Sequence, residues 1–177
     1  MKKELPHIPA NADKEEVFAV VENFLASNKL SVSGKDDKRP WGGFFLIDEN
    51  QAQKFAAFFF SELEFDSLLI TQKLSPKILI VAPQKRLSWQ YHQRRAEVWK
   101  LIAGSAKIIT SETDEQRDEV QIQLNKTITL KQGERHRLIG ADSWGIVAEI
   151  WQHTNHTNPS NEDDIIRLQD DFGREKQ

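Results

Sequence analysis

The residues SWQYHQRRAEVW, at positions 88–99, contain side chains that could bind a metal ion. Side chains two residues apart on a β-strand lie on the same face, so Gln90 and His92 are expected to lie side by side. A turn over residues 93–96 would bring Glu97 back beside them. An amide oxygen, an imidazole and a carboxylate are reasonable ligands for a divalent cation, although three ligands from one hairpin rarely complete a coordination shell.

A fourth ligand is available about forty residues further along the chain. In KQGERHRLIG, at residues 131–140, Gly133 allows a tight turn and His136 begins a new strand. An antiparallel barrel can return such a strand to the first hairpin. Taken alone, Gln90 and His92 are better explained as a hydrogen-bonded polar pair inside a barrel, so the metal hypothesis depends on the other motifs.

The composition limits the possible classes of function. The chain has 177 residues, which is enough for one domain with a substantial core. Charged residues make up 29% and the formal net charge is −3, so the composition implies no basic surface for nucleic acid. The chain has no cysteine, which excludes disulfides, thiolate metal sites and a cysteine nucleophile.

The sequence contains no pattern of a secretion signal or a membrane span. The N-terminal residues MKKELPHIPANADKEEV have no apolar stretch behind the two lysines. No other run approaches the roughly 18 apolar residues that cross a bilayer. We therefore expect a soluble cytoplasmic protein without a membrane partner.

Helical patterns occupy the first third of the chain. Asp13 and Glu16 have the spacing of a capping box, and the apolar residues that follow recur at helical spacing, which predicts a helix at about 14–27. Turn residues then lead into FFLIDEN at 44–50. Residues 50–65 also have helical spacing, although their consecutive phenylalanines would suit a buried strand as well. We predict a helix there.

From Lys77 onward, short segments rich in Ile, Val, Leu, Thr and Trp alternate with turn residues every eight to twelve positions. This pattern of short apolar segments and turns is typical of an antiparallel sandwich or barrel. The expected strands are KILIVAP (77–83), LSWQYH (87–92), EVWKLIAG (97–104), AKIITS (106–111), VQIQL (120–124), KTITLKQG (126–133) and WGIVAEIWQ (144–152). After residues 153–161 the chain is expected to leave the sheet and to end in an acidic, weakly amphipathic tail.

Four motifs, in order, resemble a known family. They are RPWG at 39–42, LSWQYHQRRAEVW at 87–99, GERHRL at 133–138 and NEDDIIRLQDDFGR at 161–174. Together they are similar to the cupin domain of type II phosphomannose isomerases, which is also found at the C-terminus of bifunctional mannose-1-phosphate guanylyltransferases. The resemblance implies a mainly β fold, a cupin-type antiparallel β-barrel (double-stranded β-helix or jelly roll), here with an added N-terminal helix.

The resemblance also implies a ligand set. The first metal position, histidine in many cupins, is glutamine in this family, so the residues that are similar to its four ligands are Gln90, His92, Glu97 and His136. One divalent metal ion is the expected cofactor. Zinc is the first candidate, and nickel, manganese or iron would also accept a nitrogen and oxygen ligand set.

Further residues are expected in a substrate pocket. In the similar type I phosphomannose isomerases, a lysine ahead of the motif and a serine within it face the substrate and its phosphate, so Lys77 and Ser88 are expected to line the pocket. Arg167, in the tail motif, is expected to hold an oxyanion or a phosphate. The proton would be moved by Lys77 or by an unassigned carboxylate.

The activity that the resemblance implies is that of a metal-dependent aldose–ketose isomerase. It would interconvert mannose 6-phosphate and fructose 6-phosphate, and a divalent ion would stabilise the developing enediolate. Two alternatives stay open: a non-catalytic cupin module that binds a metal or a sugar, and an isomerase for a pentose or a heptose.

The chain also departs from the family pattern. Gln93 and Arg94 replace two histidines that follow the ligand histidine, and the stretch before KILIV is longer than usual. We predict an N-terminal helical extension at 1–38 and a cupin domain at 39–177 with an insertion at about 43–76. A sugar phosphate is the expected small-molecule partner, and a homodimer is a candidate assembly.

Several other residues have a structural explanation. Arg167 fits an ion pair with Asp163 or Asp170 equally well. His153 and His156 lie among Thr, Asn and Pro, which indicates a loop without chemistry. The five tryptophans are expected in the barrel core or in a pocket wall. The charges expected to be solvent-exposed are those of Arg94, Arg95 and Lys100.

Overall fold

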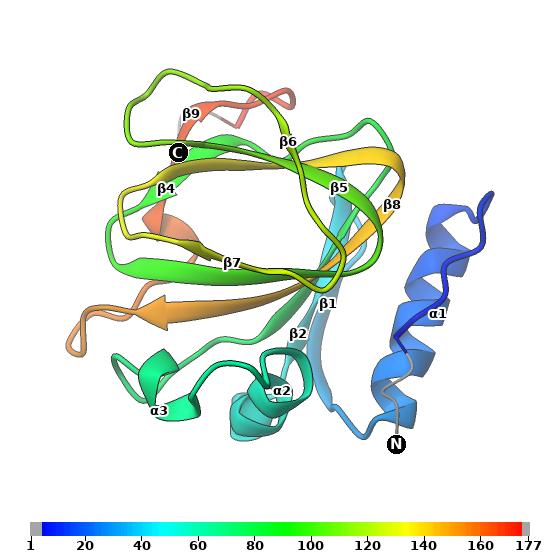
Figure 1. Ribbon diagram of the computed structural model, residues 1–177, viewed down its shortest axis with the longest axis horizontal. Coiled ribbons are helices and arrows are strands. Elements are labelled where there is room, and N and C mark those ends of the chain that lie inside the picture. The colour runs from blue at the N-terminus through cyan, green and yellow to red at the C-terminus, as the bar shows by residue number, and fades with distance from the viewer. Residues whose placement is uncertain (1–4, 175–177) are drawn as a thin grey trace.

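One curled antiparallel sheet makes up most of the protein (Figure 1). The structure, a computed structural model, describes residues 5–174. The strands within these residues are β1 (Val32–Asp36), β2 (Gly42–Ile47), β3 (Lys77–Val81), β4 (Trp89–His92), β5 (Arg95–Ser111), β6 (Val120–Gln121), β7 (Thr127–Leu130), β8 (Arg135–His153) and β9 (Ile165–Gln169). Their order is β1-β2-β3-β8-β4-β9, with β5 beside β8, and β6 and β7 beside β5. This order does not close into a ring.

The two long strands, β5 and β8, form the frame of the sheet. They pair antiparallel from Arg95 opposite His153 to Ser111 opposite Arg135. The register shifts twice, between residues 101 and 103 and between 104 and 106, where the strand bends. The two segments predicted at 97–104 and 106–111 are therefore one bent strand, and the segment predicted at 144–152 is the second half of β8.

The β3 strand is buried on both faces, which explains its continuous apolar sequence. Ile78 and Ile80 belong to a large core between the sheet and the helices. Leu79 and Val81 belong to a second core inside the barrel, and Lys77 lines the pocket next to Leu79. Lys77 therefore faces the inside of the barrel, as strand alternation predicts.

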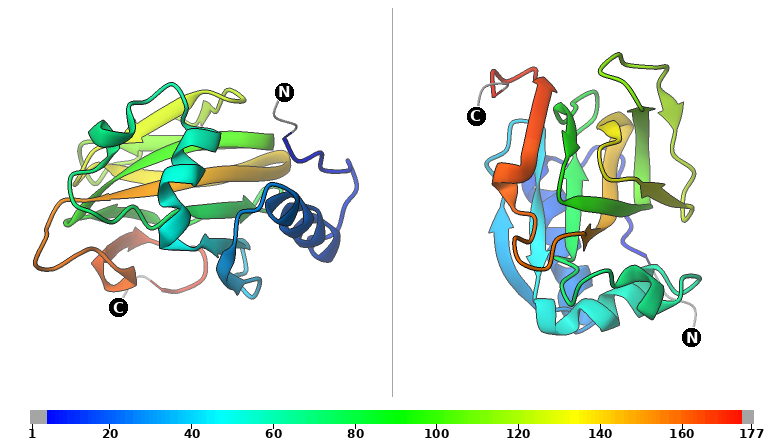
Figure 2. Two further views of the ribbon diagram at one scale, coloured as in Figure 1. Left: turned by 90° about the horizontal axis from the view of Figure 1, so that it is seen from below. Right: turned by 90° about the vertical axis from the view of Figure 1, so that its left-hand side faces the viewer.

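The helices of the described residues are α1 (Lys14–Ser27), η1 (Glu49–Gln51), α2 (Ala52–Phe59), α3 (Phe65–Leu68) and η2 (Glu162–Asp164). The helices α1, α2 and α3 lie outside the curled sheet (Figures 1 and 2), whereas η2 directly precedes β9 and its Glu162 lines the pocket. Asp13 and Glu16 form the expected capping box of α1, which confirms the predicted helix at 14–27. Phe18 of α1 packs on Phe45 of β2, with ring centroids 5.4 Å apart. The second predicted helix is confirmed as α2, but it ends at Phe59 rather than at residue 65.

The C-terminal segment corrects one prediction. Residues 165–169 return to the sheet as β9 and pair with β4, from Trp89 opposite Gln169 to His92 opposite Ile165. The prediction that the chain leaves the sheet after residue 161 is therefore wrong. The apolar run IIRL is short and flanked by acidic residues, so its pattern did not distinguish a strand from a tail.

The mainly β, antiparallel fold class with an N-terminal helix is confirmed. The predicted division at residue 38 and the insertion at about 43–76 stay predictions; within that stretch, residues 49–68 carry the helices η1, α2 and α3. Across residues 5–174, the structure has no helix with the length and apolar character needed to span a bilayer.

Candidate metal centre

Two imidazoles and one carboxylate converge inside the barrel from three strands. His92 ends β4, Glu97 lies near the start of β5, and His136 lies near the start of β8. The carboxylate oxygens of Glu97 lie 3.1 Å from Nε2 of His92 and 3.3 Å from Nε2 of His136. The two Nε2 atoms are 3.2 Å apart. All three side chains are buried, and their ligand atoms lie within 4.8 Å of one another, so the cluster could hold a metal ion.

Backbone carbonyls fix the orientation of both histidine rings. The carbonyl oxygen of Asp164 lies 3.3 Å from Nδ1 of His92, and that of Glu134 lies 3.0 Å from Nδ1 of His136. A carbonyl only accepts hydrogen bonds, so each Nδ1 carries the ring proton and each Nε2 presents its lone pair. Two lone pairs and one carboxylate then face a single point, which is the chemistry that a divalent cation satisfies.

The charges of the cluster also suit a metal. Burial lowers the pKa of His92 to about 4, although the neighbouring Glu97 acts in the opposite direction. Burial alone would raise the pKa of Glu97, but His92, Arg95 and His136 hold it well below its usual range. At neutral pH His92 is therefore neutral and Glu97 is ionised, which are the protonation states that metal ligands require.

Gln90, the expected fourth ligand, borders the cluster with its amide oxygen turned away. Oε1 of Gln90 accepts a hydrogen bond from Oγ of Ser88 at 2.5 Å, whereas Nε2 of Gln90 lies 3.5 Å from Nε2 of His92. Gln90 lies opposite His136 in the pairing of β4 with β8. The structure thus brings three of the four expected ligands together and places the fourth beside them. A half-turn of the Gln90 amide would present its oxygen to the cluster.

Arg95 lies against this cluster and was missed as a site residue. Its Nε donates to Oε1 of Glu97 at 2.7 Å, and its Nη2 lies 3.1 Å from Nε2 of His92. The guanidinium lies 3.5 Å from the centroid of the Trp151 ring, and the residue is only 2% exposed. The prediction that Arg95 is a solvated charge is therefore wrong. The available signal was strand alternation, which places Arg95 on the same inward face as Glu97.

Lys100 and Arg94, whose charges were also expected in solvent, are partly or fully buried. Lys100 is buried and its Nζ pairs with Glu62 at 2.5 Å. Arg94 is half-buried and donates to the side chains of Asn158 and Asn161. Both contacts join residues more than thirty positions apart, so local sequence carried no sign of them.

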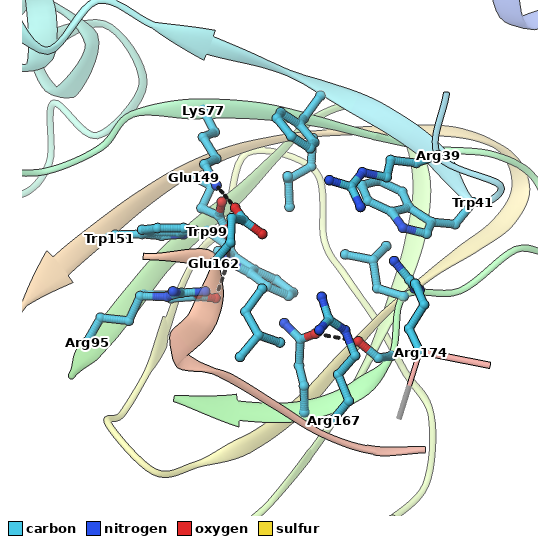
Figure 3. A pocket seen from close by; sticks show the side chains of 17 residues that line it. Arg39, Trp41, Lys77, Arg95, Trp99, Glu149, Trp151, Glu162, Arg167 and Arg174 are labelled. Carbon is cyan, nitrogen blue, oxygen red and sulfur yellow. Dashed lines mark hydrogen bonds and ion pairs between the residues drawn. The ribbon is translucent and has the colours of Figure 1, made fainter. Parts of the chain in front are cut away.

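A pocket opens beside the cluster (Figure 3). Glu97 and Gln90 belong to its lining, so the pocket reaches the candidate metal centre. The three other residues expected in a pocket, Lys77, Ser88 and Arg167, all line it. The charged and aromatic lining residues that were not expected from the sequence are Arg39, Phe44, Arg95, Glu149, Glu162 and Arg174.

The expectation that the tryptophans lie in the barrel core or in a pocket wall is confirmed for the three that line the pocket, whereas Trp89 and Trp144 pack against other clusters. Trp41, Trp99 and Trp151 line the pocket, Trp89 is fully buried, and Trp144 packs against the main core. Trp151 also contacts Lys77, whose Nζ lies 3.6 Å from the ring centroid.

One side of the pocket is closed by a contact between β3 and the C-terminal segment. Nζ of Lys77 lies 3.1 Å from Oε1 of Glu162, which is part of η2. Lys77 is 5% exposed. In Figure 3, Lys77, Glu149, Trp151 and Arg95 lie on the left of the pocket, with Glu162 next to them.

Glu149 is a buried acid that can exchange a proton near neutral pH. Burial raises its pKa to about 7, and the negative charge of Glu97 acts in the same direction. Its Oε1 accepts a hydrogen bond from Nε1 of Trp99 at 3.0 Å. Glu149 therefore fits the carboxylate that the sequence left unassigned. A glutamate inside the otherwise apolar segment WGIVAEIWQ was the signal that could have identified it.

Three arginines lie at the other side of the pocket, on the right of Figure 3: Arg39, Arg167 and Arg174. Arg167 lies opposite Gln90 in the pairing of β4 with β9. Its Nε is buried and has no hydrogen-bond partner within the described part of the chain. Asp170, one of the two expected ion-pair partners of Arg167, pairs with Arg174 at 2.7 Å. A buried donor of this kind is suited to an anionic ligand.

His153 does not lie in a loop as expected. It ends β8, is fully buried, and accepts a hydrogen bond at Nδ1 from the backbone N–H of Ser160 at 3.0 Å. Its Nε2 then carries the proton and donates to Oγ of Ser75 at 2.9 Å. In this tautomer His153 cannot act as a base toward Ser75. His156 is exposed in the following loop, as expected.

The curled antiparallel sheet and its internal cluster of two histidines and a glutamate define a cupin domain with a candidate metal centre. More narrowly, the chain belongs to the family described as mannose-6-phosphate isomerase C-terminal, which matches residues 48–170. This confirms the family that the four motifs resemble.

Two relatives show how much of a longer protein the chain matches. The mannose-1-phosphate guanylyltransferase of Salmonella montevideo is 26% identical over 162 residues, which is 90% of this chain and 28% of that protein. The xanthan biosynthesis protein XanB of Xanthomonas campestris pv. campestris strain B100 is 30% identical over 111 residues, 62% of this chain and 22% of that protein. The chain therefore spans less than a third of the length of these relatives.

A solved structure shares the fold. Procruciferin, an 11S globulin from Brassica napus, is 12% identical, with a TM-score of 0.50 over 71% of this chain and 29% of that chain. At this identity the likeness concerns the fold alone.

These findings correct the predicted activity. The relatives are named as a guanylyltransferase and a xanthan biosynthesis protein, not as phosphomannose isomerases, and the matching family describes a C-terminal part. The prediction that this chain interconverts mannose 6-phosphate and fructose 6-phosphate is therefore wrong. The motifs identify a domain, and one domain can serve proteins that catalyse different reactions.

Proposed function

We propose that this chain is a divalent-metal-binding cupin domain whose pocket receives a phosphorylated mannose, within an enzyme of mannose phosphate metabolism. The observation that carries the proposal is the position of Glu97. It belongs both to the cluster of His92, Glu97 and His136 and to the wall of a pocket lined with arginines, a lysine and tryptophans. A ligand in this pocket would contact the metal centre and the cationic groups together.

In this proposal the metal is held by His92, Glu97 and His136, with Gln90 as a fourth ligand after its amide rotates. Zinc is the first candidate, because the ligands combine imidazole and carboxylate in a buried site. Nickel, manganese and iron fit the same donors. A bound ion would supply a Lewis acid that polarises the oxygens of a sugar.

The pocket wall offers complementary groups for a sugar phosphate. Trp41, Trp99 and Trp151 provide apolar surface for the sugar ring. Nε of Arg167, which has no hydrogen-bond partner among residues 5–174, provides a cationic donor for a phosphate, whereas the ammonium of Lys77 on the opposite side of the pocket is paired with Glu162. Ser88 lies beside Gln90, and after rotation of the amide its Oγ would accept a hydrogen bond from Nε2 of Gln90 instead of donating to Oε1. Glu149 is available to hold or release a proton.

We assign the guanylyl transfer named for the relatives to a part of their chains outside this domain. The chain covers 28% of the Salmonella montevideo guanylyltransferase, which leaves most of that protein for this reaction. A cytoplasmic location and a homodimer also stay predictions, as does the expectation that neither nucleic acid nor membrane is a partner.

Metal analysis and calorimetry test the proposal. The purified chain is expected to contain one divalent ion per molecule by mass spectrometry of the elements. In titration calorimetry, mannose 6-phosphate or mannose 1-phosphate is expected to bind the metal-loaded protein, and chelator treatment is expected to remove this binding. Unphosphorylated mannose is the control for the phosphate. A chain that takes up no divalent ion, or that binds both phosphates equally well after chelation, contradicts the proposal.

Two arginine variants extend this test. Arg167→Gln is expected to weaken sugar phosphate binding by about tenfold or more, because a charge-assisted hydrogen bond is worth on the order of 1.5–3 kcal/mol. Arg117→Gln removes the same charge at an exposed position and is expected to have no effect. Equal affinities of the two variants would exclude Arg167 as the phosphate ligand.

A further inference from the structure

The residues just before β9 are bonded to the hairpin that carries the metal ligands, and Asp164 is the centre of these contacts. Oδ1 of Asp164 accepts from the backbone N–H of Gln93 at 3.0 Å, and Oδ2 accepts from that of Arg94 at 3.0 Å. Oδ2 also accepts from Oγ of Ser160 at 2.6 Å. Asp164 is 5% exposed. One buried carboxylate thus binds both amides of the turn between His92 and the start of β5.

The backbone carbonyl of the same residue contacts a candidate metal ligand. It lies 3.3 Å from Nδ1 of His92, on the side of the ring opposite to the cluster. Because the carboxylate is bonded to the two residues that follow His92, the carbonyl and the imidazole are held in one rigid unit. Displacement of Asp164 would free the His92 ring to rotate and to change its tautomer.

Arg95 connects the same segment to a second candidate ligand. Its Nη1 donates to Oγ of Ser160 at 2.9 Å and to the carbonyl of Asn161 at 3.2 Å. Its Nε donates to Oε1 of Glu97 at 2.7 Å. Arg94 adds hydrogen bonds to Asn158 and to the carbonyl of Pro159. Residues 158–164, which we name the clasp segment, therefore contact groups that hold both His92 and Glu97.

We propose that Asp164 is a positioning residue of the metal centre, and that docking of the clasp segment and binding of the metal ion are thermodynamically coupled. The proposal rests on the proposed function, because it requires that the cluster binds a divalent ion. Partners that orient metal-ligating histidines typically change metal affinity by about 10–100-fold when they are removed. Coupling is reciprocal, so the metal ion is expected to stabilise the docked clasp segment by the same free energy.

The chain contains a matched control for Asp164. Asp163 is its neighbour in the same turn of η2 and has the same charge, but it is exposed. Asp163→Asn therefore changes the net charge of the clasp segment without removing a bond to the hairpin. Asp164→Asn keeps the shape of the side chain but replaces one acceptor oxygen by an NH2 donor, which would face the backbone N–H of either Gln93 or Arg94.

Zinc affinity tests the proposal in the full chain. The dissociation constant for Zn²⁺ is measured by competition with a chromophoric chelator, for the wild-type protein and for Asp164→Asn, Asp163→Asn and Ser160→Ala. Asp164→Asn is expected to bind Zn²⁺ about 10–100-fold more weakly than the wild type. Asp163→Asn is expected to have the same dissociation constant for Zn²⁺ as the wild type. Ser160→Ala, which removes one hydrogen bond to Asp164 and one to Arg95, is expected to fall between them.

Hydrogen exchange separates positioning from a merely structural role. In the wild type, Zn²⁺ is expected to slow amide exchange at Gln93, Arg94 and the clasp segment. In Asp164→Asn, saturating Zn²⁺ is expected to protect these amides less. If Asp164→Asn does not fold, an affinity of Ser160→Ala equal to that of the wild type overturns the proposal.

The possible failures are distinguishable. A folded Asp164→Asn protein with wild-type Zn²⁺ affinity overturns the positioning role and leaves the proposed function intact. A wild-type protein that binds no Zn²⁺, Ni²⁺ or Mn²⁺ overturns the proposed function and this inference with it.

Discussion

At the scale of single residues, the site is defined by where hydrogen-bond donors and acceptors point. His92 and His136 each face a backbone carbonyl at Nδ1, so their Nε2 atoms are directed at Glu97. Burial lowers the pKa of His92 to about 4, and His92, Arg95 and His136 hold the pKa of Glu97 well below its usual range although burial acts in the opposite direction. His92, Glu97 and His136 are therefore arranged for a cation before one is bound, and binding would displace Nη2 of Arg95 from His92 and rotate the Gln90 amide.

Removal of one imidazole tests this arrangement. His136→Ala is expected to weaken Zn²⁺ binding by at least about 100-fold, because a ligand contributes more than the outer partners whose loss costs about 10–100-fold. Elemental analysis of the purified variant is expected to find almost no bound ion. His156→Ala removes an exposed histidine of the loop after β8 and is expected to retain the metal. Equal metal contents in the two variants would place the metal elsewhere.

The buried Glu149 gives a pH dependence that can be measured in the metal-free protein. Burial raises its pKa from 4.5 to about 7, so the folded protein binds this proton more tightly than the unfolded chain does. Stability from this group is fully present below pH 4.5 and decreases as the pH rises toward 7. The shift corresponds to about 3 kcal/mol at 1.36 kcal/mol per pKa unit.

Glu149→Gln removes this titration and is expected to remove the associated loss of stability. In urea unfolding between pH 5 and pH 8, the free energy of unfolding of the wild type is expected to fall relative to that of Glu149→Gln, by up to about 3 kcal/mol. Glu119→Gln changes an exposed position, and its free energy of unfolding is expected to vary with pH as that of the wild type does. If the difference between wild type and Glu149→Gln is constant over this pH range, Glu149 does not titrate in it.

At the scale of elements, the bends of β5 decide where the site residues lie. Gly104, at the second register shift, has φ +70°, and a Cβ there would lie 1.6 Å from the carbonyl oxygen of Trp144. Both the backbone angle and the close approach to β8 require glycine at this position.

Gly104→Ala is therefore expected to destabilise the protein by about 3 kcal/mol or more, since it combines left-handed strain with a backbone clash. Gly133→Ala is the matched control, because Gly133 has φ +79° but a Cβ added there would meet no other atom within 4 Å. Gly133→Ala is expected to lower the free energy of unfolding by only about 1–2 kcal/mol, because it adds left-handed backbone strain without a clash. Urea unfolding measures both. Equal losses of unfolding free energy in the two variants would show that contact with the Trp144 carbonyl oxygen does not destabilise Gly104→Ala.

The sequence predicts an element well where several local signals agree. For α1, a capping pair defines the start of the helix and apolar residues at helical spacing define its buried face. β9 was missed because a short apolar run among acidic residues carries no periodic signal, and only its pairing with β4 makes it a strand. Arg39 and Arg174 were missed as pocket residues for a related reason: tertiary packing alone brings residues so far apart in the chain to one pocket.

At the scale of the whole molecule, the topology gathers residues from position 39 to position 174 around one pocket. β4, β5 and β8 each supply a candidate ligand, so a bound ion would connect the β4–β5 hairpin to β8, which the chain reaches only after residues 112–134. The strand order is open at β1 and β9, so the sheet itself does not lock this arrangement. The metal ion is therefore expected to contribute to the stability of the fold as well as to the chemistry of the pocket.

This contribution is measurable as a shift in melting temperature. At a free Zn²⁺ concentration 100 times the dissociation constant, binding to the folded state adds about 2.7 kcal/mol. For a domain of this size, 1 kcal/mol corresponds to about 2–4 °C, so Zn²⁺ is expected to raise the Tm by about 5–10 °C and excess chelator to reverse the shift. His136→Ala is expected to show almost no shift, whereas His156→Ala is expected to shift like the wild type. A Tm that responds equally in His136→Ala and in the wild type would mean that Zn²⁺ stabilises the protein through another site.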